Sequence, residues 1–173
     1  MNGQPETQQR YIKLYGEIIG KIKPLSSPLI NSFREPAIGK FKEQGIPTRK
    51  NEAYRYTNLI PFFDHDFGSY FIPGKEDFIK AEEFRCDVED LDTHGIVLLN
   101  GFYPTINDKL RQVDGGIWVG SLNEAADKFP DKIRDHYNKY INGNNDGLIH
   151  LNTALASDGI FMYIPEGGVL EKP

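Results

Sequence analysis

The sequence has little of what most catalytic and metal-binding sites require. Among its 173 residues there is one cysteine, Cys86, and the four histidines are spread along the chain. One thiol excludes an internal disulfide and a metal site built from several thiolates of this chain, and it fits a reducing compartment. The signatures of phosphate-binding loops, zinc hydrolases and serine hydrolases are missing as well. We therefore expect a protein that is not an enzyme and holds no cofactor of its own.

Long apolar runs are also missing. The longest, residues 159–165, is far shorter than the roughly 18 residues that a membrane-spanning helix needs. The first residues have neither the basic nor the apolar stretch of a secretory signal. These features predict a cytoplasmic protein that does not bind membranes.

The charge is weakly negative and unevenly distributed. A formal net charge of −5 provides no overall field that would attract nucleic acid. Residues 1–60 nevertheless carry a net charge of +5, whereas residues 61–114 carry −7. Either the basic N-terminal third docks an acidic partner, or it complements the acidic middle third within the molecule.

The apolar content is sufficient for an ordinary core, and the turn-forming residues are numerous. Hydrophobic residues make up 39% of the chain, and 17 glycines and 11 prolines predict many turns and short elements. Apolar spacings of three and four predict amphipathic helices over residues 5–23 and 28–44. We expect Pro36 to interrupt the second helix and Gly45 to end it.

Further along the chain, local signals predict a hairpin, a strand and another helix. The pair Asn100 and Gly101 is typical of a tight two-residue turn, and residues 116–119 are typical of a strand. Ser121 is suited to cap a helix. That helix is expected to pause at Pro130 and to end at residues 142–143.

The C-terminal stretch is predicted to be a separate unit. The polar residues 144–147 resemble a linker, which divides the chain into residues 1–146 and 147–173. A short helix over 148–156 and strands at 160–164 and 169–170 are expected to follow. A final strand without a partner leaves an open edge, so we expect the sequence to be truncated within a sheet.

Two short segments are candidates for chemistry or binding. In residues 64–66, His65 lies between two aspartates, which suggests a metal-dependent hydrolase, although adjacent residues rarely converge on one ion. Residues 49–56 mix cations with Tyr54 and Tyr56, a pattern that can bind nucleic acid. Glu52 and the acidic surroundings argue against that reading, so we expect no nucleic acid partner. Thr48 is suited to cap a short helix there, and residues 58–94 are expected to form loops with short extended pieces.

Two segments together resemble the SufB/SufD family of iron–sulfur cluster assembly proteins. Residues 45–57 are similar to the family's PTRK-x-E-x-W-K-Y-T stretch, and they match the SufD branch more closely than the SufB branch. Residues 151–173 resemble the family's LNTA-x-x-x-DG segment and the strand that follows it. The departures are mild, with Tyr54 in place of the usual Trp and Arg55 in place of Lys. The matching motif positions are Pro47, Thr48, Arg49, Lys50, Glu52, Tyr54, Arg55, Tyr56, Leu151, Asn152, Asp158 and Gly159.

The resemblance implies an α+β chain with a non-catalytic scaffold role. It would contain a mostly helical N-terminal domain with a few short strands, followed by the first strands of a truncated right-handed parallel β-helix. SufB-like and SufC-like subunits would be its partners, mainly through regions outside this sequence, and the full complex would handle the iron–sulfur cluster transiently. The alternative hypothesis is a stand-alone docking module for a sulfur or iron donor protein, suggested by the basic N-terminal third.

Overall fold

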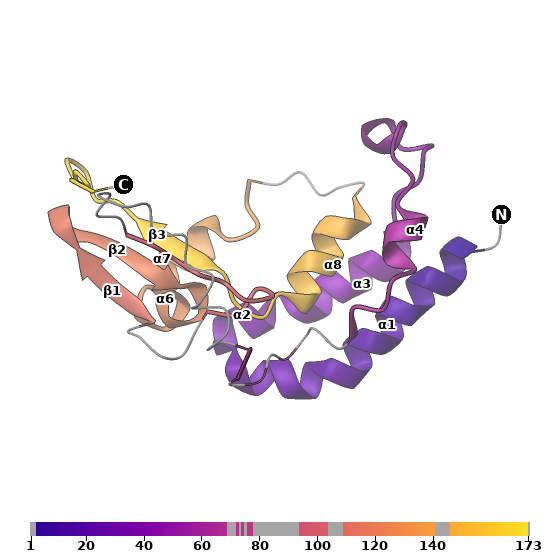
Figure 1. Cartoon of the computed structure of the whole chain (residues 1–173), viewed down its shortest axis with the longest axis horizontal. Coiled ribbons are helices and arrows are strands. Elements are labelled where there is room, and N and C mark those ends of the chain that lie inside the picture. Colours follow the sequence, from indigo (N-terminus) through magenta and orange to yellow (C-terminus); the bar gives the residue numbers. More distant parts are fainter. Residues whose placement is uncertain are drawn as a thin grey trace.

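The described part of the chain forms a helical region and a smaller sheet region that lie end to end (Figure 1). The structure is a computed structural model, and it describes residues 3–68, 72, 74, 76–77, 94–103, 109–140 and 146–172. Mixed helix and sheet confirm the α+β class. No helix among these residues is long and apolar enough to cross a membrane.

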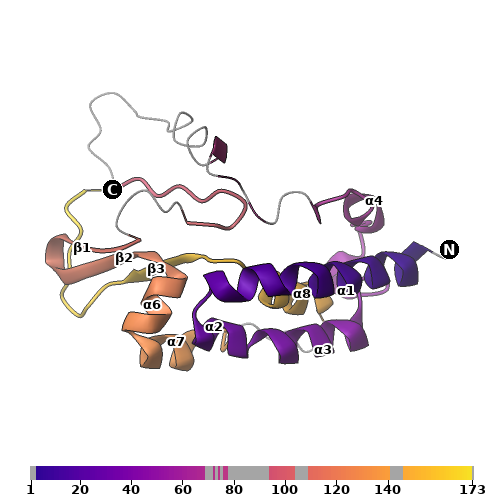
Figure 2. The same cartoon turned by 90° about the horizontal axis from the view of Figure 1, so that it is seen from below.

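The helical region is built from α1 (Gly3–Ile22), α2 (Pro28–Ser32), α3 (Arg34–Gln44) and α8 (Gly147–Leu155), and a 3₁₀ turn, η1 (Lys23–Leu25), follows α1. The prediction of the first helix is confirmed, because its apolar side chains face the other helices and are buried. Figure 2 shows α1 and α3 running alongside each other, with α8 beside both. Their shared core includes Tyr11, Tyr15, Ile18, Ile22, Ile38, Phe41, Leu151 and Ala154.

The break in the second predicted helix lies at Phe33, not at Pro36. Pro36 sits in the first turn of α3, where its missing N–H costs nothing. The proline ring would clash with the carbonyl four residues earlier, at Ser32, if one helix continued through this point. The chain therefore turns at Phe33, just after Ser32. As predicted, Gly45 ends α3, with a φ of 68°.

Helix α8 begins where two backbones come very close. A Cβ atom at Gly147 would lie 1.8 Å from the carbonyl oxygen of Gly45, so this contact requires glycine. Asp146 caps the helix by accepting a hydrogen bond from the Leu148 N–H at 3.0 Å. The prediction of a linker over residues 144–147 is therefore wrong for its last two residues, and its first two lie outside the described part. The division into residues 1–146 and 147–173 stays a prediction.

The sheet region contains β1 (Leu110–Val113), β2 (Ile117–Ser121) and β3 (Ile160–Tyr163) in the antiparallel order β1-β2-β3. A 3₁₀ turn, η4 (Asp114–Gly116), joins β1 to β2. The expected strand at residues 116–119 is confirmed, although β2 begins one residue later, at Ile117. Residues 169–170 form no strand. The described strands are antiparallel, so the parallel β-helix stays a prediction.

Helix α6 (Leu122–Lys128) packs against β2 and β3, and α7 (Pro130–His136) follows it and packs against α6. Phe129, between them, packs against Trp118 and Phe161, with ring centres 5.4 and 5.9 Å away. The pause at Pro130 is confirmed, but the helix ends at His136 instead of residues 142–143. The backbone leaves the helix at Tyr137, whose ψ is 126°, and Asn138 follows in a left-handed conformation with a φ of 58°.

Two smaller predictions concern the segments between these regions. Asn100 and Gly101, with φ values of 49° and 83°, form the expected tight turn. Leu99 and Phe102 are joined across it by two backbone hydrogen bonds, although no regular strand extends from the pair within the described residues. In the described part of residues 58–94, the expected extended pieces are replaced by the short helix α4 (Ile60–Phe63).

Candidate functional site

The two family-like motifs lie in separate parts of the fold. Residues 48–58, here called the projecting segment, extend away from the helical region between α3 and α4 (Figure 1). Asp158 and Gly159 lie where the helical region meets the sheet region, here called the junction. The structure therefore assigns the two motif segments different surroundings.

The base of the projecting segment is held in a defined turn. Pro47 is buried, and the Asn51 N–H donates to the Thr48 carbonyl oxygen at 2.9 Å. In return, Asn51 Oδ1 accepts from the Thr48 N–H at 2.9 Å, and Thr48 Oγ1 accepts from the Lys50 N–H at 3.2 Å. Thr48 thus stabilises a turn and does not cap η2 (Glu52–Tyr54), the 3₁₀ helix that follows.

Tyr54 connects the projecting segment to α8. Its hydroxyl donates to Asp146 Oδ2 at 2.6 Å, while the other oxygen of Asp146 caps α8. The hydrogen bond to Asp146, together with partial burial, raises the pKa of Tyr54 to about 12. One carboxylate therefore joins segments that are 92 residues apart in the sequence.

The remaining motif side chains of the projecting segment face solvent. Arg49, Lys50, Glu52, Arg55 and Tyr56 are all exposed, and Tyr56 retains 89% of its accessible surface. The Arg55 guanidinium lies 5.5 Å from the centre of the Tyr56 ring and 3.9 Å from a Glu52 carboxylate oxygen. These side chains make the exposed surface of the projecting segment cationic and aromatic.

At the junction, Asp158 organises the backbone of two elements. Its carboxylate accepts from the Ser121 hydroxyl at 2.7 Å, from the Asn123 N–H at 3.0 Å and from the Gly159 N–H at 2.9 Å. Ser121 is fully buried and caps α6 by accepting from the Glu124 N–H, as the sequence predicted. Asp158 therefore fixes the start of α6 against the start of β3.

Arg34 is a buried structural residue of the junction that the sequence did not single out. Its side chain is 0% exposed, and it donates to Asn31 Oδ1, the Ala154 carbonyl oxygen and Ser26 Oγ at 2.8 to 3.0 Å. Burial lowers the pKa of this guanidinium. The signal was the spacing of four between Ile30, Arg34 and Ile38, which places the arginine on the buried face of its helices.

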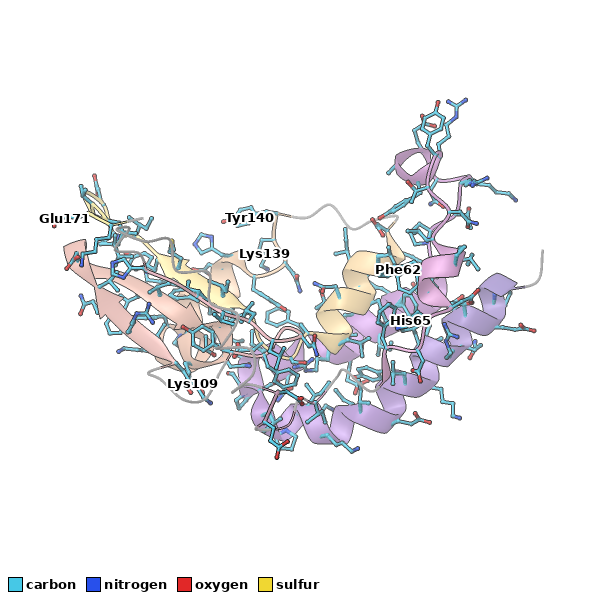
Figure 3. The ribbon with its side chains drawn as sticks, viewed as in Figure 1. Phe62, His65, Lys109, Lys139, Tyr140 and Glu171 are labelled. Atoms are coloured by element: carbon cyan, nitrogen blue, oxygen red, sulfur yellow. The ribbon has the colours of Figure 1, made fainter. Side chains whose placement is uncertain are left out.

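The other C-terminal motif residues are split between the core and a groove. Leu151 is buried in the helical core, whereas Asn152 is exposed. Asn152 and Asp158 both line an open groove of about 810 Å³. Apolar side chains such as Phe62 and Leu155 line the same groove, and Figure 3 shows Phe62 and His65 beside α8.

The Asp64-His65-Asp66 sequence does not form a metal site in the structure. Asp64 accepts from the Thr7 hydroxyl at 3.3 Å, Asp66 accepts from the Gly68 N–H at 2.8 Å, and the His65 ring packs on Phe67. Among the described residues, no group of three or more histidine, cysteine, aspartate or glutamate side chains is arranged to hold a metal ion. Cys86 lies outside the described residues.

Comparison with known proteins identifies a family. The family described as the SufBD protein N-terminal region matches residues 5–173, which is nearly the whole chain. No solved structure matches the chain.

Proposed function

Because the chain belongs to the SufBD family, we propose that it is the N-terminal part of a SufD-type scaffold subunit in SUF iron–sulfur cluster assembly. The family match over residues 5–173 carries this proposal. The choice of SufD over SufB rests on the closer resemblance of residues 45–57 to the SufD stretch. In this proposal the chain is not an enzyme, and it works in the cytoplasm.

The roles of the motif side chains support a scaffold function. The Asp158 carboxylate accepts hydrogen bonds from a hydroxyl and two backbone N–H groups, and the Tyr54 hydroxyl donates one to Asp146. Leu151 is packed in the core. These residues therefore hold the fold together and leave other side chains exposed to partners, which is the role expected of a scaffold.

The proposed function involves partner subunits and an iron–sulfur cluster. SufB-like and SufC-like subunits assemble with the whole protein, and the iron–sulfur cluster is the cargo of that complex. The chain itself holds no cofactor.

The proposed continuation into a β-helix is supported by the surface of β3. Ile160, Met162 and Ile164 follow one another at alternate positions and are 49%, 52% and 53% exposed. Strand β3 is also an edge of the described sheet, with β2 on its other side. Proteins normally cover both a free strand edge and an exposed apolar face of a sheet, and the further strands of a β-helix would do so.

Genetic complementation tests this function. The complete gene product that contains this chain is expressed in bacteria lacking their own SufD, and growth is measured under iron limitation. We expect rescue of growth and co-purification with SufB-like and SufC-like subunits. Rescue of a strain lacking SufB instead would overturn the SufD assignment, and failure to co-purify with either subunit would overturn the scaffold role.

A further inference from the structure

The projecting segment carries positive charge that its own surroundings leave largely uncompensated. Within the part of the chain that the structure describes, Arg49 and Lys50 make no ion pair. Arg55 approaches Glu52 at 3.9 Å, but both side chains are mostly exposed, so the attraction is weak. Three cations and one carboxylate leave this segment positive on a chain whose net charge is −5.

The segment is also held in shape before any partner arrives. The Thr48–Asn51 turn, the Tyr54–Asp146 hydrogen bond and the close contact of Gly45 with Gly147 fix both its base and its middle. Because this backbone is already ordered, binding through it loses less conformational entropy than binding through a free loop.

Tyr56 adds an apolar anchor to the charged tip. Its ring is 89% exposed, and the neighbouring Arg55 guanidinium lies 5.5 Å from the ring centre. Tyrosine and arginine are, with tryptophan, the residue types most enriched at the energetic centres of protein interfaces. A tyrosine offers a large contact area at a small entropy cost, because it has few rotatable bonds.

We propose that Arg49, Lys50, Arg55 and Tyr56 form a docking site for an acidic protein surface, in which carboxylates surround an apolar contact for the tyrosine. The planar guanidiniums of Arg49 and Arg55 can each take a carboxylate through two parallel hydrogen bonds. This site goes beyond the scaffold role and does not depend on it, since it rests on exposure, charge and shape alone.

A protein partner fits the segment better than a nucleic acid does. Glu52 lies among the cations, and the acidic chain around them repels a long polyphosphate. Strong binding of nucleic acid uses many phosphate contacts, whereas three cations suit a small group of carboxylates.

The test measures binding of the 173-residue chain to a defined acidic probe. The probe is a fluorescein-labelled peptide of glutamates with two interspersed leucines, followed by fluorescence polarisation at about 20 mM and about 200 mM salt. We expect saturable binding that weakens at the higher salt. Amide NMR signals from residues 48–58 should shift before those of the sheet region.

Charge reversal separates a specific site from general electrostatics. Replacing Arg49, Lys50 and Arg55 together by Glu should weaken peptide binding by about tenfold or more. The matched control reverses the exposed lysines Lys21, Lys40 and Lys139, which changes the net charge equally outside the projecting segment.

The control lysines are expected to change binding by less than about twofold. Equal losses in the two triple variants, or no binding by the unaltered chain, would overturn the proposal. So would tighter binding of a single-stranded oligonucleotide through the same three cations, since the partner would then be a nucleic acid.

A matched tyrosine pair tests the apolar anchor. Tyr56→Ala should weaken peptide binding about three- to tenfold, whereas Tyr140→Ala should leave it unchanged. Tyr140 is also highly exposed, at 75%, but it lies away from the projecting segment (Figure 3). Equal effects of the two variants would remove Tyr56 from the site. Circular dichroism verifies that every variant is folded.

Discussion

Asp158 in the junction and Arg49 in the projecting segment both belong to the family-like motifs, but their environments are opposite. Asp158 accepts hydrogen bonds from one hydroxyl and two backbone N–H groups, whereas Arg49 is exposed and has no ion pair among the described residues. Tyr54 lies between these extremes, with an anchored hydroxyl at the edge of an exposed segment. The difference teaches that the two family-like motifs together supply both residues that fold the chain and residues that remain available to a partner.

The largest effect on stability is expected in the junction, from the substitution Arg34→Ala. The change removes three hydrogen bonds, leaves the buried Ala154 carbonyl and two partly buried acceptors without this donor and opens a cavity, so we expect the free energy of unfolding to fall by about 4 kcal/mol. Urea unfolding measures this loss. Arg134→Ala, which removes an exposed arginine paired with Asp131, is the control and should cost less than about 0.5 kcal/mol. Similar costs for the two variants would contradict the role of Arg34.

Asp158→Ala should have the next largest effect. We expect a loss of about 3 kcal/mol, because the Ser121 hydroxyl and two backbone N–H groups lose their acceptor. Asp135→Ala removes an exposed carboxylate and should change stability by less than about 0.5 kcal/mol. Thermal unfolding of the two variants side by side decides the matter, and a stable Asp158 variant would mean that the junction does not depend on this carboxylate.

Tyr54→Phe probes the boundary between the two environments. Loss of the hydrogen bond to Asp146 should reduce stability by about 1 kcal/mol at neutral pH. The folded chain holds the Tyr54 proton more tightly than the unfolded chain, because the folded pKa is raised from 10 to about 12. This contribution is complete below pH 10 and is lost as the pH rises toward 12.

Alkaline unfolding curves check this pH dependence. Stability should fall more steeply between pH 10 and 12 in the unaltered chain than in the Tyr54→Phe variant. Tyr15, whose pKa burial also raises to about 12, titrates in both proteins and cancels in the comparison. Parallel curves would show that Tyr54 is not held by Asp146 in solution.

The smallest effect on stability is expected at the exposed tip. Reversing Arg49, Lys50 and Arg55 together should change the free energy of unfolding by less than about 0.5 kcal/mol, since their side chains face solvent. Urea unfolding of the variant used for peptide binding provides the measurement. A loss comparable to that of Asp158→Ala would show that the cations serve the fold, and the contrast between the two regions would disappear.

Features that depend on neighbours in the sequence were predictable. The apolar spacing of α1, the glycine that ends α3, the Asn100-Gly101 turn and the Ser121 cap all appear where expected. Each is decided by sterics or hydrogen bonds within a few residues. The exposure of the cations in residues 49–56 also agrees with the ordinary behaviour of charged side chains.

Features that depend on distant partners were not predictable. Strand β1 has little apolar alternation and is defined by its pairing with β2. One acceptor of the buried Arg34 guanidinium is the Ala154 carbonyl oxygen, 120 positions away in the sequence.

The amino-acid sequence alone therefore determined the local elements and the family of this protein, since both reside in short patterns of side chains. The tertiary structure alone decided which motif residues are buried and which are presented. That division depends on pairs such as Tyr54 with Asp146, whose contact energy exists only after the chain has brought them together.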